Sequence, residues 1–448
     1  MKILDLRSCI SFLEEEKQLV HIKKEVPKDY ELAGVGWKFN GESAILFEKI
    51  RNYNIPVITG TCWNIKNVSK MFQVQDSFAL LNKFSEALAA RVKSKTVTDG
   101  PVKDVVIKKD IDLLKILPIP WHSRKDAGPY ITAGIAISKD IETHVSSQSF
   151  HRFEVKGPAK AGICIEPYSH KKTMLDKMEK RNKPLEVAVV IGLDPSIMFS
   201  ASVTGAEVPH ITDKLEIAGA LRGEPVKMVK CETIDLEVPA DAEIVIEGLV
   251  LPKTLEKEGP FAEASGHYGE ALERNIFQAT AITYRRNTVY QTIIGGSDEH
   301  LLLYSLALSA SVNRFVKKID PNILAVYLTH KSCGMHAIVS MKKEEEGQQW
   351  NAAMATFVAL PTIKHVIVVD EDVDIFNTND IEWALAMRFQ GDKGLTVIRE
   401  ARGEVIDPSS KRGLTTKVAV DATVPLELAK SKERIKYDDI DISKYLSF

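Results

Sequence analysis

The spacing of hydrophobic and polar positions changes along the chain. Residues 76–92 carry apolar side chains at helical spacing behind an Asp or Ser, which predicts an amphipathic helix with an N-terminal cap. The polar stretch 93–104 follows, and we expect a domain boundary close to it. The segment 113–130 contains three prolines and a glycine, so it predicts an irregular loop.

The middle of the chain is rich in Val, Ile, Thr and Tyr. Segments of this composition, mostly bounded by Gly, Pro or Asp, predict strands at 131–138, 187–191, 243–251 and 280–294. Few helical patterns separate these segments. A barrel or sandwich is therefore expected for the middle domain.

After Gly295 and Gly296 the pattern becomes an alternation of helices and strands. We expect helices at 301–317, 344–358 and 380–389, and strands at 323–328 and 365–369. Strands that alternate with helices indicate βαβ units and a parallel sheet. A basic loop at 409–417, a short helix and a charged tail end the chain.

Composition narrows the class of protein. Among 448 residues, 59 basic and 61 acidic side chains give a net charge of −2, which argues against a nucleic-acid-binding protein. No apolar run approaches the roughly 18 residues of a membrane span, and charges interrupt the N-terminal segment where a signal peptide would be apolar. The five cysteines are scattered and form no CxxC pair, as in a reducing compartment. We expect a soluble, cytoplasmic protein.

Several common catalytic motifs are missing from the sequence. It contains no GxGxxG after a strand, no GxxxxGK[ST], no HExxH and no GxSxG. Standard Rossmann enzymes, P-loop enzymes, zincins and α/β-hydrolases are therefore disfavoured.

The segment 258–269, EGPFAEASGHYG, is the strongest candidate for chemistry. Glu258 and Glu263 are separated by a Gly-Pro turn, and further glycines follow. Such backbone freedom lets two carboxyl groups converge on one cavity, as acid/base catalysis requires. A solvated loop with two ordinary glutamates is the alternative, and the packed Gly, Pro and aromatic residues favour the catalytic interpretation.

Candidate anion-binding residues lie in the β-rich region. Arg152 follows the stretch SQSFH on a predicted strand, where a guanidinium facing a cavity suits a substrate carboxylate or a phosphate. A surface arginine is equally compatible with this pattern. His170 belongs to the basic stretch PYSHKK, which suits a phosphate or an exposed loop.

Three further clusters have structural alternatives. The acidic run 370–374 suggests a Mg²⁺ or Ca²⁺ site, but it lacks EF-hand spacing, so a strand end with a helix cap is favoured. The run 298–300 lies at a domain junction, where a ligand cleft is common, but a core or hinge role suits it equally. A third cluster is basic: it either binds an anion or forms a solvated loop, and it consists of Lys411, Arg412 and Lys417. His300 and Arg388 are candidates for substrate contact or for structural roles.

Taken together, these segments resemble the UbiD family of prenylated-FMN-dependent reversible decarboxylases. The resemblance extends from about residue 111 to 425 and is most specific at 219–248, 258–269 and 368–389. It implies an α/β multidomain fold with an N-terminal α/β domain (1–110), a central flavin-reductase-like split β-barrel that binds prenylated FMN (111–300) and a C-terminal α/β domain with a dimerising tail (301–448).

The resemblance also implies a reaction and its residues. The reaction is the reversible decarboxylation of an α,β-unsaturated or (hetero)aromatic acid, and the family's Arg-Glu-Glu/Asp triad falls on Arg152, Glu258 and Glu263. Glu263 would donate the proton, and Glu258 would pair with Arg152, which orients the cofactor and the substrate carboxylate. Cofactor contacts are implied for Ser147, Ser149, Phe150, His151, Arg152, Cys164, Ser169, His170, Lys214 and Lys417.

The expected metal site departs from the family pattern. Family members hold a divalent ion (Mn²⁺ or Mg²⁺) and potassium near the flavin phosphate, and His170 occupies the expected histidine position. The Asn five residues before the triad Arg is Ser147 here, and the Glu five residues before the Gly of AGALRG is Lys214. An ammonium cannot ligate a metal ion. Either Lys214 replaces the ion, or the cofactor site has decayed, or Glu216 is the true counterpart of the Glu.

Partners and an alternative function follow from the same resemblance. A small carboxylic acid is the expected substrate, a flavin prenyltransferase the expected supplier of the cofactor, and a homo-oligomer built on a dimer the expected assembly. The alternative is a non-catalytic paralogue or a subunit of a multi-component (de)carboxylase.

Overall fold

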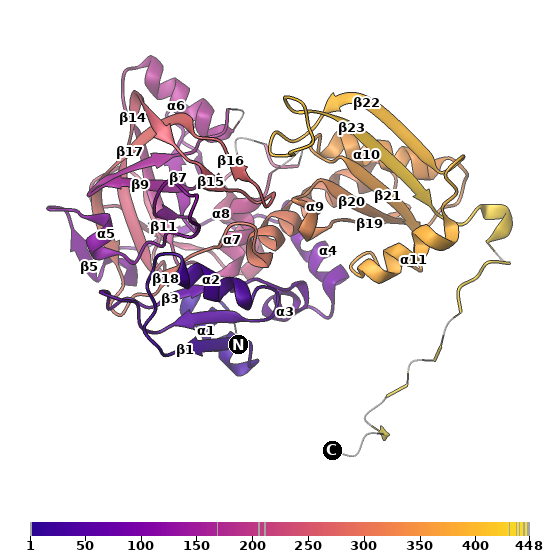
Figure 1. Ribbon diagram of the computed structural model, residues 1–448, viewed down its shortest axis with the longest axis horizontal. Helices are drawn as coiled ribbons and strands as arrows, with labels where there is room; N and C mark the ends of the chain where they lie inside the picture. Colours follow the sequence, from indigo (N-terminus) through magenta and orange to yellow (C-terminus); the bar gives the residue numbers. More distant parts are fainter. Residues whose placement is uncertain are drawn as a thin grey trace.

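The computed structural model describes residues 2–167, 169–204, 207–209, 212–429, 431–435, 437–438, 440–441 and 444–445. Figure 1 shows the N-terminal elements packed against a large central sheet, while the C-terminal domain lies to one side. The long helix α9 (Asp298–Ile319) runs between these parts. No helix in the described part of the chain has the length and apolarity needed to cross a membrane.

The N-terminal part combines four helices with a small sheet. The predicted helix at 76–92 is confirmed as α4, and the Asp76 side chain caps it by accepting from the Ala79 N–H at 2.7 Å. The sheet has the order β1-β2-β3-β18, and β18 comes from much later in the chain. The elements are α1 (Leu6–Glu15), β1 (Leu19–Ile22), α2 (Glu31–Lys38), β2 (Ala44–Phe47), β3 (Val57–Thr59), α3 (Ile65–Met71), α4 (Ser77–Ala87) and β18 (Tyr290–Gln291).

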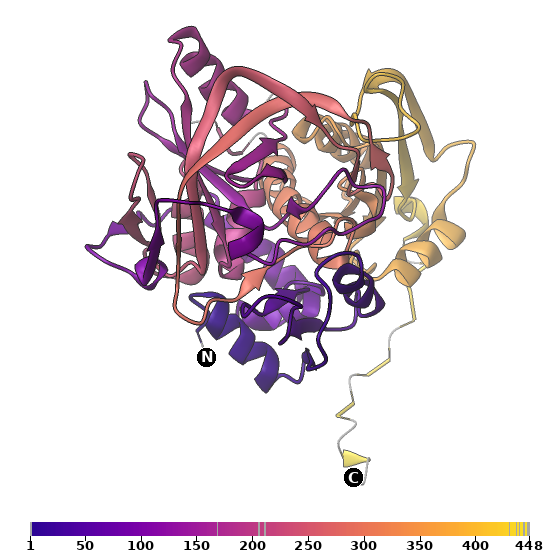
Figure 2. The same ribbon diagram turned by 60° about the vertical axis from the view of Figure 1, so that its left-hand side comes forward.

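The central part is built on a nine-stranded antiparallel sheet with the order β6-β9-β10-β17-β14-β11-β7-β8, to which β5 adds by pairing with β17. Figure 2 shows the long strands β14 and β17 curving over this part of the molecule. The strands are β5 (Val105–Ile107), β6 (Tyr130–Ile131), β7 (Ile135–Lys139), β8 (Ser146–Phe150), β9 (Phe153–Gly157), β10 (Lys160–Ile163), β11 (Leu185–Ile191), β14 (Ile244–Glu258) and β17 (Leu272–Tyr284).

Short elements complete the central part. The helices are α5 (Leu113–Ile116), α6 (His170–Lys180), α7 (Pro195–Ser202) and α8 (Lys214–Arg222). The small sheets are β13-β12-β4 and β15-β16, formed by β4 (Lys95–Thr96), β12 (Lys227–Lys230), β13 (Glu237–Pro239), β15 (Phe261–Ala262) and β16 (Tyr268–Gly269). The predicted irregular loop at 113–130 therefore begins with one helical turn, α5.

The C-terminal domain contains a five-stranded sheet of order β19-β20-β21-β23-β22. The predicted parallel sheet is wrong in part: β20-β21 and β21-β23 are parallel, but β19-β20 and β22-β23 are antiparallel. Only short links join β19 to β20 and β22 to β23, and a parallel crossover needs a longer connection. Besides α9, the elements are β19 (Ile323–Leu328), β20 (His336–Met341), α10 (Gln348–Ala359), β21 (His365–Asp370), α11 (Thr378–Arg388), β22 (Leu395–Arg402) and β23 (Leu414–Ala422).

Candidate active site

Arg152, Glu258 and Glu263 meet although they are far apart in the sequence. Arg152 lies between β8 and β9, Glu258 ends β14, and Glu263 follows β15. The Arg152 Nε donates to Glu258 Oε1 at 2.9 Å, and its Nη2 donates to Glu258 Oε2 at 2.9 Å. The remaining terminal nitrogen, Nη1, donates to Glu263 Oε1. One guanidinium thus bridges both carboxylates.

Burial and an aromatic ring hold this triad in place. Glu258 is fully buried, and the Arg152 side chain is 13% exposed. The guanidinium lies 4.8 Å from the centre of the Phe261 ring, within the range of a cation–π interaction. Burial alone would lower the pKa of Arg152, but the hydrogen bonds to Glu258 and the negative charges around the guanidinium together outweigh it and raise the pKa above its ordinary value. Arg152 is therefore a permanent cation with a fixed orientation.

The β15–β16 hairpin sets the position of Glu263. The Glu263 N–H donates to the His267 carbonyl oxygen at 2.9 Å, which closes the turn. The Ala262 N–H donates to Asp126 Oδ1 at 2.9 Å, so the loop after α5 anchors the hairpin. Gly269 faces the carboxyl group, since a Cβ there would lie 2.6 Å from Glu263 Oε1. Only glycine at this position leaves room for the Glu263 side chain.

A cavity of about 740 Å³ opens beside the triad, between the central sheet and α9. Its volume falls within the range of small-molecule and cofactor sites. The sequence-predicted residues that line it are Ser147, Ser149, Phe150, His151, Arg152, Cys164, Ser169, His170, Lys214, Glu263 and His300. Glu258 supports Arg152 from outside the cavity lining. The apolar part of the wall includes Val203, Phe261, Ile293, Leu303 and Tyr304.

His151 is locked in one neutral form. Its Nδ1 lies 2.8 Å from the Cys164 carbonyl oxygen, which can only accept, so Nδ1 carries the proton. Its Nε2 then accepts from the Ser149 hydroxyl at 2.9 Å. Burial, with a smaller effect of the nearby Lys171 charge, lowers the pKa of His151 to about 3. The imidazole is thus an uncharged, oriented part of the wall.

Two lysine side chains also line the cavity. Lys171 is the second residue of α6 and Lys214 the first residue of α8. Burial lowers the pKa of Lys214 to about 8, and burial together with the Lys214 charge lowers the pKa of Lys171 to about 7. The sequence gives no sign that Lys171 is buried, because its neighbours in PYSHKK are polar and no apolar pattern surrounds it.

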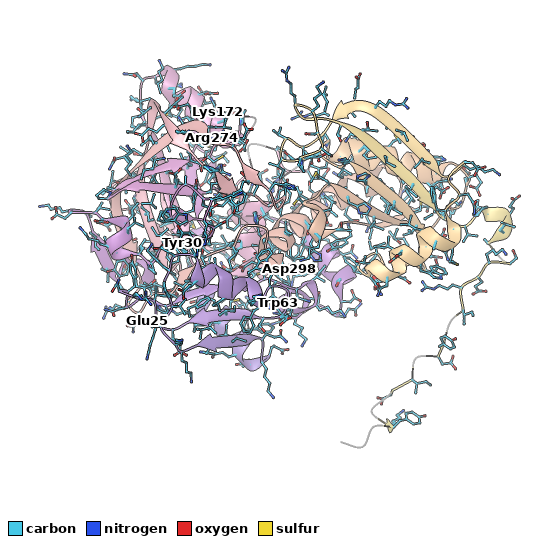
Figure 3. The ribbon with its side chains drawn as sticks, viewed as in Figure 1. Glu25, Tyr30, Trp63, Lys172, Arg274 and Asp298 are labelled. Atoms are coloured by element: carbon cyan, nitrogen blue, oxygen red, sulfur yellow. The ribbon has the colours of Figure 1, made fainter. Side chains whose placement is uncertain are left out.

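Three adjacent residues at the start of α9 make different contacts. Glu299 is 1% exposed and accepts from the Gly60 N–H at 2.7 Å and the Thr61 hydroxyl at 2.6 Å, which ties α9 to the N-terminal part. Asp298, labelled in Figure 3, accepts from the Asn40 amide. Only His300 of this run lines the cavity. Burial lowers the pKa of His300 to about 4, so it is neutral at neutral pH.

Lys417 and Arg388 are placed elsewhere than the sequence suggested. Lys417 lies in β23 rather than in a loop, and its ammonium donates to two main-chain carbonyl groups at 2.7 and 2.6 Å. It does not line the cavity. Arg388 forms ion pairs with Asp370 at 2.9 Å and Asp372 at 2.6 Å. The acidic run 370–374 is thus a structural salt-bridge cluster.

The described residues contain no group of three or more His, Cys, Asp or Glu side chains arranged to hold a metal ion. Ser147 and Lys214 both line the cavity beside His170, whereas Glu216 does not. The expectation that Glu216 supplies the missing ligand is therefore not supported. Ser147, His170 and Lys214 therefore do not form a set of ligands that fits a divalent ion.

Comparisons with known proteins agree over most of the chain. Family models match in order: the 3-octaprenyl-4-hydroxybenzoate carboxy-lyase N-terminal domain at 10–88, its Rift-related domain at 93–298 and its C-terminal domain at 302–422. Among solved structures, the chain is similar to the UbiD-class enzyme HmfF from Pelotomaculum thermopropionicum in complex with FMN. The two sequences are 40% identical, and the structures superpose with a TM-score of 0.94 over 99% of this chain and 100% of that one.

Two curated relatives are decarboxylases. Anhydromevalonate phosphate decarboxylase of Methanothermobacter thermautotrophicus is 34% identical over 96% of this chain and 99% of its own length. Gallate decarboxylase of Lactiplantibacillus plantarum is 31% identical over 99% of both chains.

Proposed function

The chain belongs to the UbiD family of carboxy-lyases, and on this premise we propose that it is a reversible, non-oxidative decarboxylase that uses prenylated FMN. The observation that carries the proposal is the triad: a buried guanidinium that bridges two carboxylates at the wall of a cofactor-sized cavity. Its substrate class is an α,β-unsaturated or (hetero)aromatic carboxylic acid.

The cavity fits a phosphorylated flavin. It combines an apolar wall near α9 with the ammonium groups of the buried Lys171 and the half-buried Lys214, which suit a phosphate. The hydrogen-bonded Ser149 and His151 side chains add a polar part to the lining. When bound, prenylated FMN supplies the electron sink that decarboxylation needs.

Arg152 orients the substrate carboxylate. Glu258 occupies its Nε and Nη2, so the guanidinium cannot rotate, and Nη1 remains directed toward Glu263 and the cavity. A carboxylate bound at this nitrogen is held next to the acid that must deliver a proton. Such positioning is worth several orders of magnitude in rate.

Glu263 supplies the proton. The bond between the substrate carbon and its carboxylate breaks, carbon dioxide leaves, and the electron pair stays on the carbon. Glu263, in its protonated form, then gives its proton to that carbon, which forms a C–H bond, and Glu263 is left as the carboxylate that pairs with Arg152. In the reverse direction, the Glu263 carboxylate removes the same proton.

The apolar wall supports a flat, unsaturated substrate. Phe261, Ile293 and Leu303 present carbon surfaces next to the triad, and Tyr304 adds a ring on α9. An aromatic acid buries its ring against such surfaces while its carboxylate faces Arg152. The similarity to gallate decarboxylase points to the same substrate class.

The remaining expectations are proposals that rest on the family. We take the central sheet as the flavin-reductase-like split β-barrel of residues 111–300, between domains at 1–110 and 301–448. A flavin prenyltransferase would supply the cofactor, and a homo-oligomer built on a dimer would form in the cytoplasm.

A direct test is to co-express the chain with a flavin prenyltransferase, record the visible spectrum, and measure carbon dioxide release from cinnamic, hydroxybenzoic and furoic acids. We expect turnover of at least one acid and its loss in Glu263→Gln. A protein that retains prenylated FMN, yet is inert toward the whole panel, would contradict the proposal. A chain that retains no flavin, and in which Glu263→Gln changes nothing measurable, would instead favour the non-catalytic subunit, which the departures at Ser147 and Lys214 suggest.

A further inference from the structure

Two ammonium groups at the cavity, the buried one of Lys171 and the half-buried one of Lys214, have no carboxylate partner among the described residues. Lys171 is 1% exposed, and its Nζ donates to Ser138 Oγ at 2.6 Å and to the Ala136 carbonyl oxygen at 3.2 Å. The Nζ of Lys214 donates to the Ala201 carbonyl oxygen at 3.2 Å. Within the described ranges, no carboxylate lies within 4.0 Å of either ammonium. Both side chains line the cavity.

The carboxylate next to Lys214 is engaged elsewhere. Asp213 caps α8 by accepting from the Leu215 N–H at 3.0 Å, and it accepts from the Gln148 amide at 2.9 Å. The same Gln148 side chain accepts from the Lys214 N–H at 2.9 Å. This network fixes the start of α8 and leaves the Lys214 ammonium facing the cavity lining.

Uncompensated buried charge indicates an anionic ligand. Taking an ammonium out of water without a partner is unfavourable, and two such groups in one cavity also repel each other. Lys171 is 1% exposed and Lys214 is half-buried, so both ammonium groups bear this cost. A dianion placed between them would relieve it, whereas a divalent cation would increase it.

We propose that Lys171 and Lys214 together neutralise the phosphate of the flavin and thereby take the place of a divalent metal ion. The ligand class is a phosphate monoester dianion carried by a flavin, and in this respect the inference rests on the proposed function. The part played by Lys171 is new. Lys214 alone would neutralise one of the two negative charges of the phosphate, and Lys171, which lies on α6 and donates to Ser138, would neutralise the second.

The test uses the protein purified without cofactor, FMN and riboflavin as probes, and flavin fluorescence as the readout. Riboflavin lacks only the phosphate, so the ratio of the two affinities isolates the phosphate subsite. We expect wild-type protein to bind FMN at least about 100-fold more tightly than riboflavin, with no change after EDTA treatment or addition of Mn²⁺.

Lys171→Met and Lys214→Met should each weaken FMN binding by about tenfold or more and leave riboflavin binding unchanged. Lys214→Arg, which keeps the charge, should retain most of the preference for FMN. Lys343→Met is the matched control: this lysine is buried in the C-terminal domain, outside the cavity, and donates to Thr423 Oγ1 at 2.9 Å. It should change neither affinity. Thermal melts check that each variant is folded.

Three results would overturn the inference. One is a stoichiometric divalent ion on which FMN binding depends. Another is an equal loss of FMN and riboflavin affinity in both lysine variants, which would indicate a structural role. The third is a wild-type chain with no preference for FMN. An inert holoenzyme with an intact, lysine-dependent preference for FMN would instead contradict only the proposed decarboxylase activity.

Discussion

Replacing Glu258 by Gln tests whether the triad acts as one unit. The two side chains have nearly the same shape, but one carboxylate oxygen becomes an NH₂ group that faces an Arg152 N–H. Glu258 is fully buried and accepts from the Nε and the Nη2 of Arg152 at 2.9 Å each. The substitution therefore removes a negative charge. It also places the NH₂ donor of Gln against an N–H donor of Arg152, at a buried position where water cannot enter to bridge them.

The expected cost follows from these contacts. Removing one partner of a buried ion pair costs about 3–5 kcal/mol. Because Arg152 keeps its contact with Glu263, we expect the lower end of that range, about 3 kcal/mol of unfolding free energy. Turnover should fall by at least about 100-fold, since an Arg152 that leaves its position by about 1 Å misplaces the substrate carboxylate.

Urea unfolding and initial rates of carbon dioxide release measure the two effects separately. Glu247→Gln is the control: Glu247 is 1% exposed and accepts from the main-chain N–H groups of Glu232 at 2.7 Å and Thr233 at 2.6 Å, without contacting the cavity. It should lose stability and keep its turnover number. If Glu258→Gln lost stability like the control but kept wild-type turnover, the triad would be merely structural.

Three further predictions test other parts of the structure. Gly269→Ala places a Cβ 2.6 Å from Glu263 Oε1, so the turnover number should fall at least about tenfold in a protein whose melting temperature is little changed. Lys417→Met removes two hydrogen bonds to carbonyl groups, so it should lower the melting temperature and leave flavin retention unchanged in absorbance spectra. Burial lowers the pKa of His122 to about 4, from about 6.5 when unfolded, so about 3 kcal/mol of stability present above pH 6.5 should disappear as the pH falls to 4. In His122→Gln, urea midpoints should depend less on pH over that interval, and an unchanged slope would contradict this reasoning.

Local patterns in the sequence predicted the positions of helices and strands better than they predicted which strands pair. The strand at 323–328 is found with the same bounds as β19, and α4 begins where Asp76 indicated a cap. The stretch 131–138 instead divides into β6 and β7, and β18 leaves the central part to join the N-terminal sheet. Strand partners and directions depend on contacts distant in sequence, which periodicity does not encode.

The difference between local patterns and distant contacts also explains which site residues could be predicted from the sequence. Arg152 and Glu263 belong to segments with a recognisable family pattern, and the structure brings them together. Lys171 has no such mark, because its burial comes from Ser138 and Ala136 on another element. Lys417 sits in a basic stretch that suggests anion binding, yet β23 directs its ammonium to carbonyl groups of its own domain.

In the proposed reaction, we infer that the geometry of Arg152 also links substrate binding to proton transfer. Glu258 holds Nε and Nη2, so Glu263 and an incoming carboxylate compete for Nη1. A substrate that binds there takes over the contact that Glu263 makes in its absence, and the released acid is free to turn toward the substrate carbon. Because Glu258 keeps the guanidinium in place during this exchange, its role is to hold the arginine while the partner of Nη1 changes. The fully buried carboxylate and the partly exposed one therefore have different tasks, although both contact the same side chain.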